Sequence, residues 1–147
     1  MSAMLPKRRL IAAMAVAGVM GLLASYTSAQ MADGQKVTLS GSNEVPPVTT
    51  SAAGTGTVTI AADRSVKANI TVTGMTATAS HIHEGAAGVN GPVIVPFTKT
   101  ADNTFVAPDG AKLTEAQYTS YKAGNLYVNV HSAANPGGEV RAQLKGN

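Results

Sequence analysis

Two of the three histidines in this 147-residue chain stand one residue apart, in the segment "ASHIHEGAAGVNGPVIV" that runs from Ala79 to Val95. Side chains alternate along a β-strand, so that His81 and His83 point to one face and Ile82 points to the other. Positions i and i+2 on one face lie roughly 6 to 7 Å apart, which suits two imidazoles that converge on one ion. This spacing indicates a metal site on a strand.

The third histidine ends a second strand-like segment, "NLYVNVH". Alternation divides that segment into a core set and an outer set, which are Leu126, Val128 and Val130 on the one hand and Tyr127, Asn129 and His131 on the other. His131 would complete a three-histidine site with an open position for water or substrate, provided that the two strands are neighbours. The sequence leaves that adjacency open.

Imidazole ligands suit copper and zinc, and the absence of cysteine argues against blue-copper, iron–sulfur and thiolate zinc sites. We expect a copper ion, with zinc as the alternative, because copper binds such ligands more tightly. Four residues are candidates for a fourth ligand or for orienting the imidazoles, namely Tyr127, Asn129, Glu139 and Arg141. Glu84 has the opposite parity to the histidine pair.

The competing interpretation needs no metal. In it, the three histidines are solvated on the outside of the sheet, and Glu139 and Arg141 form an exposed surface ion pair of small energetic value. In the first interpretation, Glu139 and Arg141 instead orient imidazoles or steer an anion.

A weak internal repeat relates "HIHEGAAGVNGPV" to "NVHSAANPGGEV". Each unit is a strand that ends in Ile-His or Val-His, a loop of Ala, Gly, Asn and Pro, and a return to a strand at Val. The repeat predicts two similar hairpins in which His83 and His131 occupy equivalent places. Asn129 is then the counterpart of His81.

The elements that must position these residues are short strands, because Thr, Val, Ala and Gly alternate in runs separated by turn residues. Strands are predicted around residues 37–39 and at 54–60, 66–73, 79–83, 93–97, 104–107, 125–131 and 139–144. One short helix is predicted at 114–122, with Thr114 as N-cap and Gly124 as the stop. The fold class is therefore all-β, an antiparallel Greek-key β-sandwich or barrel of about seven to eight strands.

The first 29 residues have the pattern of a signal peptide, with a basic start at Lys7 to Arg9, an apolar run from Leu10 to Ser25 and small residues up to Ala29. We expect cleavage there, a flexible segment at 30–36 and one β domain at 37–147. The protein would then be secreted or periplasmic, with no stable membrane anchor after cleavage. An uncleaved anchor is the alternative.

The excess of basic residues belongs to that leader. The chain has 11 Lys and Arg against 8 Asp and Glu, and three of the basic residues lie at Lys7 to Arg9. The remainder is formally neutral and offers no basic surface for a phosphate backbone, so we expect no nucleic-acid partner.

Three segments resemble the CHRD domain, a module first recognised as a repeat in chordin and found alone in many secreted bacterial proteins. They are "LSGSNEVPPV", "HIHEGAAGVNGPVIVPF" and "GNLYVNVHSAANPGGEVRAQL". The resemblance runs from about Val37 to Leu144. It implies export and an immunoglobulin-like or barrel β-fold, and it implies no generic catalytic activity.

A looser similarity is to copper–zinc superoxide dismutase, a Greek-key sandwich in which a His-Val-His strand supplies two copper ligands and an arginine guides the anion. His81-Ile82-His83 resembles the first feature, and Arg141 is the candidate for the second. The bridging histidine, the zinc-binding aspartate loop and the disulfide of that family have no counterpart in this sequence.

These observations support three interpretations of function. The first is an exported copper-binding protein that uses His81, His83 and His131 in copper handling or redox chemistry. The second is a non-enzymatic module that binds another exported protein or a matrix through its loops at 85–90 and 135–138, without metal. The third is a copper-dependent oxidoreductase of the dismutase type. We expect a binding protein rather than an enzyme.

Overall fold

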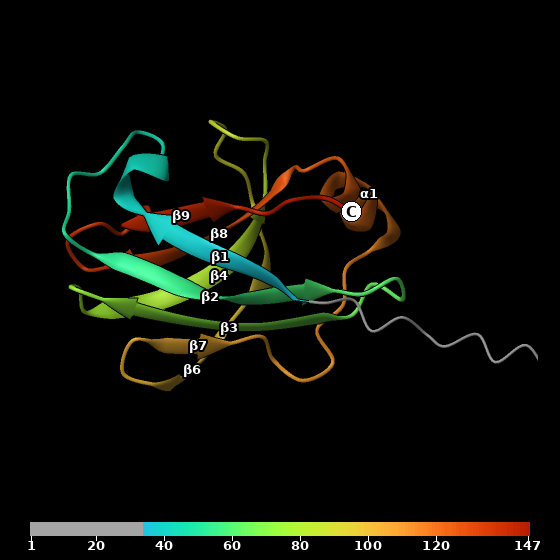
Figure 1. Ribbon diagram of the computed structural model, residues 1–147, viewed down its shortest axis with the longest axis horizontal. Helices are drawn as coiled ribbons and strands as arrows, with labels where there is room; N and C mark the ends of the chain where they lie inside the picture. Colours follow the sequence, from blue (N-terminus) through green and yellow to red (C-terminus); the bar gives the residue numbers. More distant parts are fainter. Residues whose placement is uncertain (1–33) are drawn as a thin grey trace, which may run out of the picture.

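A computed structural model describes residues 34–147 of the chain (Figure 1). The predicted leader and most of the segment 30–36 lie outside these residues. The strands are β1 (Gln35–Ser40), β2 (Ala53–Ile60), β3 (Val66–Thr73), β4 (Ala77–Glu84), β5 (Val93–Pro96), β6 (Thr98–Ala101), β7 (Thr104–Val106), β8 (Leu126–Ser132) and β9 (Val140–Gln143). A 3₁₀ turn, η1 (Gly41–Asn43), follows β1, and one helix, α1 (Glu115–Lys122), precedes β8.

The nine strands form one antiparallel sheet in the order β5-β4-β8-β9-β1-β2-β3-β7-β6. Its two edge strands are consecutive in the chain and are separated only by Phe97. The Phe97 amide donates to the carbonyl of Ser80 on β4 at 3.0 Å, so this stretch leaves β4 and continues beside β7. The sheet is therefore a nearly closed barrel, and the all-β antiparallel prediction is confirmed.

The interior of the barrel is filled by the apolar residues of the alternating runs. Seven of them are fully buried, namely Leu39, Ile70, Ile82, Leu126, Val128, Val130 and Val140. Burial of one such side chain stabilises the fold by about 1.5–3 kcal/mol. The predicted core face of the "NLYVNVH" strand is confirmed, and Ile82 occupies the core between the two histidines of β4.

The predicted hairpin 54–73 is present as β2–β3, with Arg64 at positive φ (73°) in its turn. The predicted helix is also present, and Thr114 caps it in a capping box with Gln117. Figure 1 shows α1 beside the C-terminus, at the end of the sheet away from η1. No helix within residues 34–147 is both long and apolar enough to cross a membrane.

The structure has nine strands within residues 34–147, against the expectation of about seven to eight. β6 escaped prediction because all four of its residues, Thr98 to Ala101, are exposed. A strand with no buried side lacks the alternation of apolar and polar residues that reveals strands in a sequence. β1 begins at Gln35, two residues before the expected start of the domain.

Candidate metal centre

The two strands that carry histidine lie side by side. β4 pairs with β8 so that His81 is opposite Asn129 and His83 is opposite Tyr127, with His131 two residues further along β8. The adjacency that the sequence left open is thus provided by the fold. The two hairpins expected from the internal repeat, β4–β5 and β8–β9, are both present.

The three imidazoles gather on one face of this pair of strands. Nδ1 of His81 lies 3.0 Å from Nε2 of His131, and the ring centroids of His81 and His83 are 5.5 Å apart. Each residue offers a nitrogen within 4.8 Å of the other two, and no other group of His, Asp and Glu in residues 34–147 comes together in this way. Nitrogens bound to one ion at about 2.0–2.1 Å lie roughly 3.0–3.5 Å apart, so small side-chain movements bring the three into coordination.

Backbone carbonyls orient two of the rings. Nδ1 of His83 lies 2.9 Å from the carbonyl oxygen of Gly91, and Nδ1 of His131 lies 2.8 Å from that of Pro136. A carbonyl oxygen only accepts hydrogen bonds, so both Nδ1 atoms carry the hydrogen, and Nε2 is bare in the neutral ring. In each hairpin, the loop that follows the strand therefore occupies Nδ1 of its own histidine and leaves Nε2 free to bind an ion.

Burial keeps the rings of β4 neutral. Together with the nearby imidazoles of His131 and His83, it lowers the pKa of His81 to about 4. Burial also lowers the pKa of His83, although the hydrogen bond to Gly91 opposes the shift. Neutral imidazole is the form that binds metal ions, and both rings are in that form at pH 7.

The face that carries the histidines is covered, which contradicts a solvated sheet exterior. His83 is 7% exposed, and Tyr127 and Asn129 are each 2% exposed, while His81 and His131 are half-buried. The segments 41–52, 85–92 and 133–139 cover it, and each makes hydrogen bonds to this part of the sheet or to another of the three segments. Buried polar side chains between these loops and the strands form a second, polar layer on the outside of the barrel.

Arg141 belongs to this polar layer and is 1% exposed. Its guanidinium lies 3.4 Å from the centre of the Tyr127 ring, which stacks in turn on His83 at 4.8 Å. It donates to Asn90 Oδ1 at 3.0 Å and to the Val89 carbonyl at 2.8 Å. A guanidinium held in this way supports the loop and the stacked rings, and it is not placed to steer an anion in from solvent.

Glu139 is buried as well, at 7% exposure. Its carboxylate accepts hydrogen bonds from Thr50, at 2.7 Å, and from Ser132. Burial raises the pKa of Glu139, but these hydrogen bonds outweigh that effect and lower it. The alternative in which Glu139 and Arg141 form an exposed ion pair is therefore wrong, and the hydrogen bonds of Glu139 go to hydroxyl groups rather than to an imidazole. Glu84 likewise accepts from Ser120, at 2.5 Å.

Sequence reasoning missed Glu44, which follows η1 and is 5% exposed. Burial raises the pKa of its carboxyl above the ordinary value, although Arg141 and the Asn129 amide oppose the shift. Three buried side-chain atoms within residues 34–147 have no hydrogen-bond partner, namely Glu44 Oε1, His83 Nε2 and Asn129 Oδ1. Nothing in the local sequence marked Glu44, because the strand order of the barrel is what brings it to β8.

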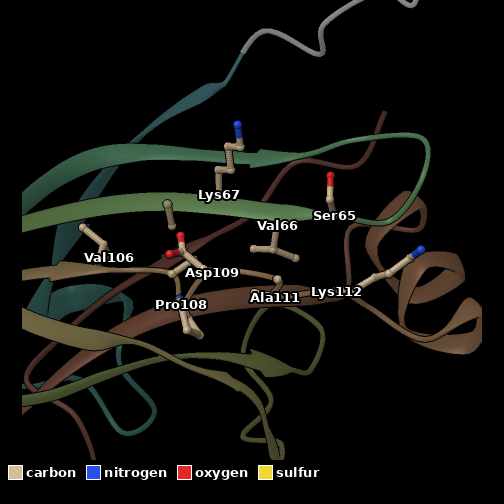
Figure 2. Close-up of a pocket in the computed structure, with 11 residues that line it drawn as sticks. Ser65, Val66, Lys67, Val106, Pro108, Asp109, Ala111 and Lys112 are labelled. Carbon is tan, nitrogen blue, oxygen red and sulfur yellow. The ribbon is translucent and has the colours of Figure 1, made fainter.

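Two pockets complete the description. One, of about 470 Å³, lies between β3 and the segment 106–112, where Figure 2 shows the side chain of Val66 directed toward that segment and the amino groups of Lys67 and Lys112 directed away. It contains no histidine and no cluster of metal-binding groups. A second pocket, of about 410 Å³, lies over the polar layer and is lined in part by Glu44 and Arg141.

A family model described as the CHRD domain matches residues 35–144. The matched range includes all nine strands, the three histidines and Glu44. A search of curated proteins and a search of solved structures each found no significant match.

Proposed function

The chain belongs to the CHRD domain family, and we propose that in this protein the domain binds one copper ion through His81, His83 and His131. The observation that carries the proposal is the convergence of three imidazole nitrogens within 4.8 Å on a covered face of the sheet. Two of these rings are oriented by backbone carbonyls before any ion binds. Such preorganisation reduces the ordering that binding requires.

The hydrogen bonds indicate which atoms bind. Nε2 of His83 and Nε2 of His131 are the bare nitrogens, whereas Nδ1 of His81 donates to His131 in the metal-free protein. An ion between these rings takes the place of that hydrogen. The proton leaves Nδ1 of His81, and Nε2 of the same half-buried ring takes one up from solvent.

Copper is the proposed ion because imidazole ligands without thiolate suit copper and zinc, and copper binds such ligands more tightly. The signal-peptide pattern of residues 1–29 supports export, so the proposed role is copper handling in a secreted or periplasmic protein. A partner that delivers or receives the ion would be another exported protein.

Equilibrium titration tests the proposal. The purified protein is titrated with Cu(II) and with Zn(II) against a competing chelator, and bound metal is counted by mass spectrometry. We expect one copper per chain, tighter than zinc, and loss of that binding in His83→Ala and His131→Ala. Binding no tighter than that of an unfolded peptide with three histidines would refute the proposal.

The other two interpretations make different predictions. A non-metal interaction module predicts that all three histidine variants keep function and that changes in the loops 85–90 and 135–138 abolish partner binding. A redox enzyme predicts that bound copper cycles between Cu(II) and Cu(I) during turnover. The buried, hydrogen-bonded Arg141 gives the dismutase alternative no support.

A further inference from the structure

The buried atoms without partners are all hydrogen-bond acceptors. Glu44 Oε1 and Asn129 Oδ1 are oxygens, and His83 Nε2 is bare because Nδ1 of that ring donates to Gly91. A buried polar atom that lacks a partner costs about 1–3 kcal/mol. The cluster therefore requires an occupant that can satisfy acceptors.

Asn129 lies between the other two residues. Its amide nitrogen is on the side of the carboxylate, because Nδ2 of Asn129 and Oε1 of Glu44 both lie against Gly138, where an added Cβ would overlap each of them. Nδ2 only donates and Oδ1 only accepts, so the accepting oxygen is on the branch of the amide away from Glu44.

His83 Nε2 and Asn129 Oδ1 are thus two buried acceptors without partners on the same face of the β4–β8 pair. A metal ion bound at Nε2 would satisfy that nitrogen and the Asn129 oxygen at the same time. Asn129 is opposite His81 in the ladder and two residues before His131, so its side chain emerges on the face of the three histidines.

We propose that Oδ1 of Asn129 is the fourth ligand of the ion and that Glu44 is a positioning residue. When the ion is bound, Nδ2 donates to the Glu44 carboxylate, whose Oε1 is otherwise without a partner, and Oδ1 is held toward the metal. This inference rests on the proposed copper site. It makes the site a closed set of three nitrogens and one oxygen instead of a three-histidine site with an open position. Closed coordination is typical of metal sites that hold an ion, whereas catalytic sites keep a position free.

The experiment uses Cu(II) affinity and the parallel copper hyperfine coupling in the paramagnetic resonance spectrum. We expect Asn129→Leu and Glu44→Leu to weaken binding by about 10- to 100-fold and to change that coupling, as loss of an orienting partner does. Glu44→Gln keeps an oxygen that accepts from Nδ2, so its affinity and spectrum should remain close to those of the wild type. Glu139→Leu is the matched control, because it removes a buried carboxylate that contacts hydroxyl groups instead of Asn129.

The outcomes separate this inference from the proposal on which it rests. Wild-type affinity and an unchanged spectrum in both Asn129→Leu and Glu44→Leu, with binding lost in His83→Ala, would overturn the fourth ligand and leave the three histidines. Absence of copper binding by the wild-type protein would overturn both. If Asn129→Leu does not fold, Asn129→Asp takes its place, since it retains an oxygen ligand. That variant should bind copper with an altered spectrum, and an unaltered spectrum would count against ligation.

Discussion

At the scale of single residues, backbone carbonyl groups set the orientation of two of the three histidine rings. The carbonyls of Gly91 and Pro136 select the tautomers of His83 and His131. The alternation of side chains along strands predicted which residues share the face of the histidines. It did not predict these carbonyl contacts, because a loop conformation is not periodic.

Gly138 illustrates how tightly the polar layer is packed. Its φ is +126°, and a Cβ would overlap both Glu44 and Asn129. We expect Gly138→Ala to lower the free energy of unfolding by about 1–3 kcal/mol and to weaken copper binding, because backbone strain and overlap displace the Asn129 amide.

Gly137→Ala is the matched control for that change, because a Cβ at Gly137 meets nothing within 4 Å. It should leave stability and affinity close to those of the wild type in chemical denaturation and chelator competition. Equal effects of the two substitutions would contradict the view that the polar layer leaves no room for a side chain at position 138.

Glu139 predicts a pH dependence of stability. Its pKa is below the ordinary value in the folded protein, so its contribution to stability is present above the unfolded-state pKa of about 4.3 and is lost as the pH falls through the folded-state value. We expect Glu139→Gln to lower the free energy of unfolding by about 2 kcal/mol at pH 7. Urea unfolding from pH 7 to pH 3 should show the difference from the wild type shrinking as Glu139 is protonated. A difference that stays constant over this range would contradict the assignment.

At the scale of elements, β4 and β8 are each followed by a loop whose backbone carbonyl accepts a hydrogen bond from the histidine of that strand. This likeness was visible in the sequence as a weak repeat, and the two hairpins it predicted are present. The exposed strand β6 was not visible, because it has no apolar side. The polar layer was not visible either, because its three loops are far apart in the chain.

The helix gives a prediction at this scale. Thr114 Oγ1 accepts a hydrogen bond from the Gln117 backbone amide at 3.1 Å, and the Thr114 backbone amide donates one to Oε1 of Gln117 at 2.9 Å. Thr114→Ala should lower the free energy of unfolding by about 1 kcal/mol. Thr119→Ala, at an exposed position within the same helix, should have little effect, since alanine is the better helix former. Thermal unfolding compares the two, and an equal loss in both would argue against the capping box.

At the scale of the whole molecule, the barrel has an apolar interior and a polar layer outside β4, β8 and β9. Composition and alternation predicted the class of fold and the interior. They did not predict that a second face of the sheet would be buried, since a run of Tyr, Asn and His resembles an exterior. The burial of Arg141 and Glu139, which one of the two interpretations put at the surface, follows from the same cause.

Copper should stabilise the entire domain if it binds only the folded protein. At free copper of about 100 times the dissociation constant, the gain is about 2.7 kcal/mol, which raises the melting temperature by several degrees in a domain of this size. His83→Ala should show no such rise in a calorimetric scan at the same copper concentration. An equal rise in both proteins would indicate binding elsewhere.

The most direct test of the central claim is the nitrogen hyperfine spectrum of the wild-type protein loaded with one equivalent of Cu(II). Three inequivalent imidazole nitrogens on the copper, with one missing in each of His81→Ala, His83→Ala and His131→Ala, are the result predicted here. A spectrum with no imidazole coupling, or one that the three substitutions leave unchanged, would contradict a copper centre on these histidines.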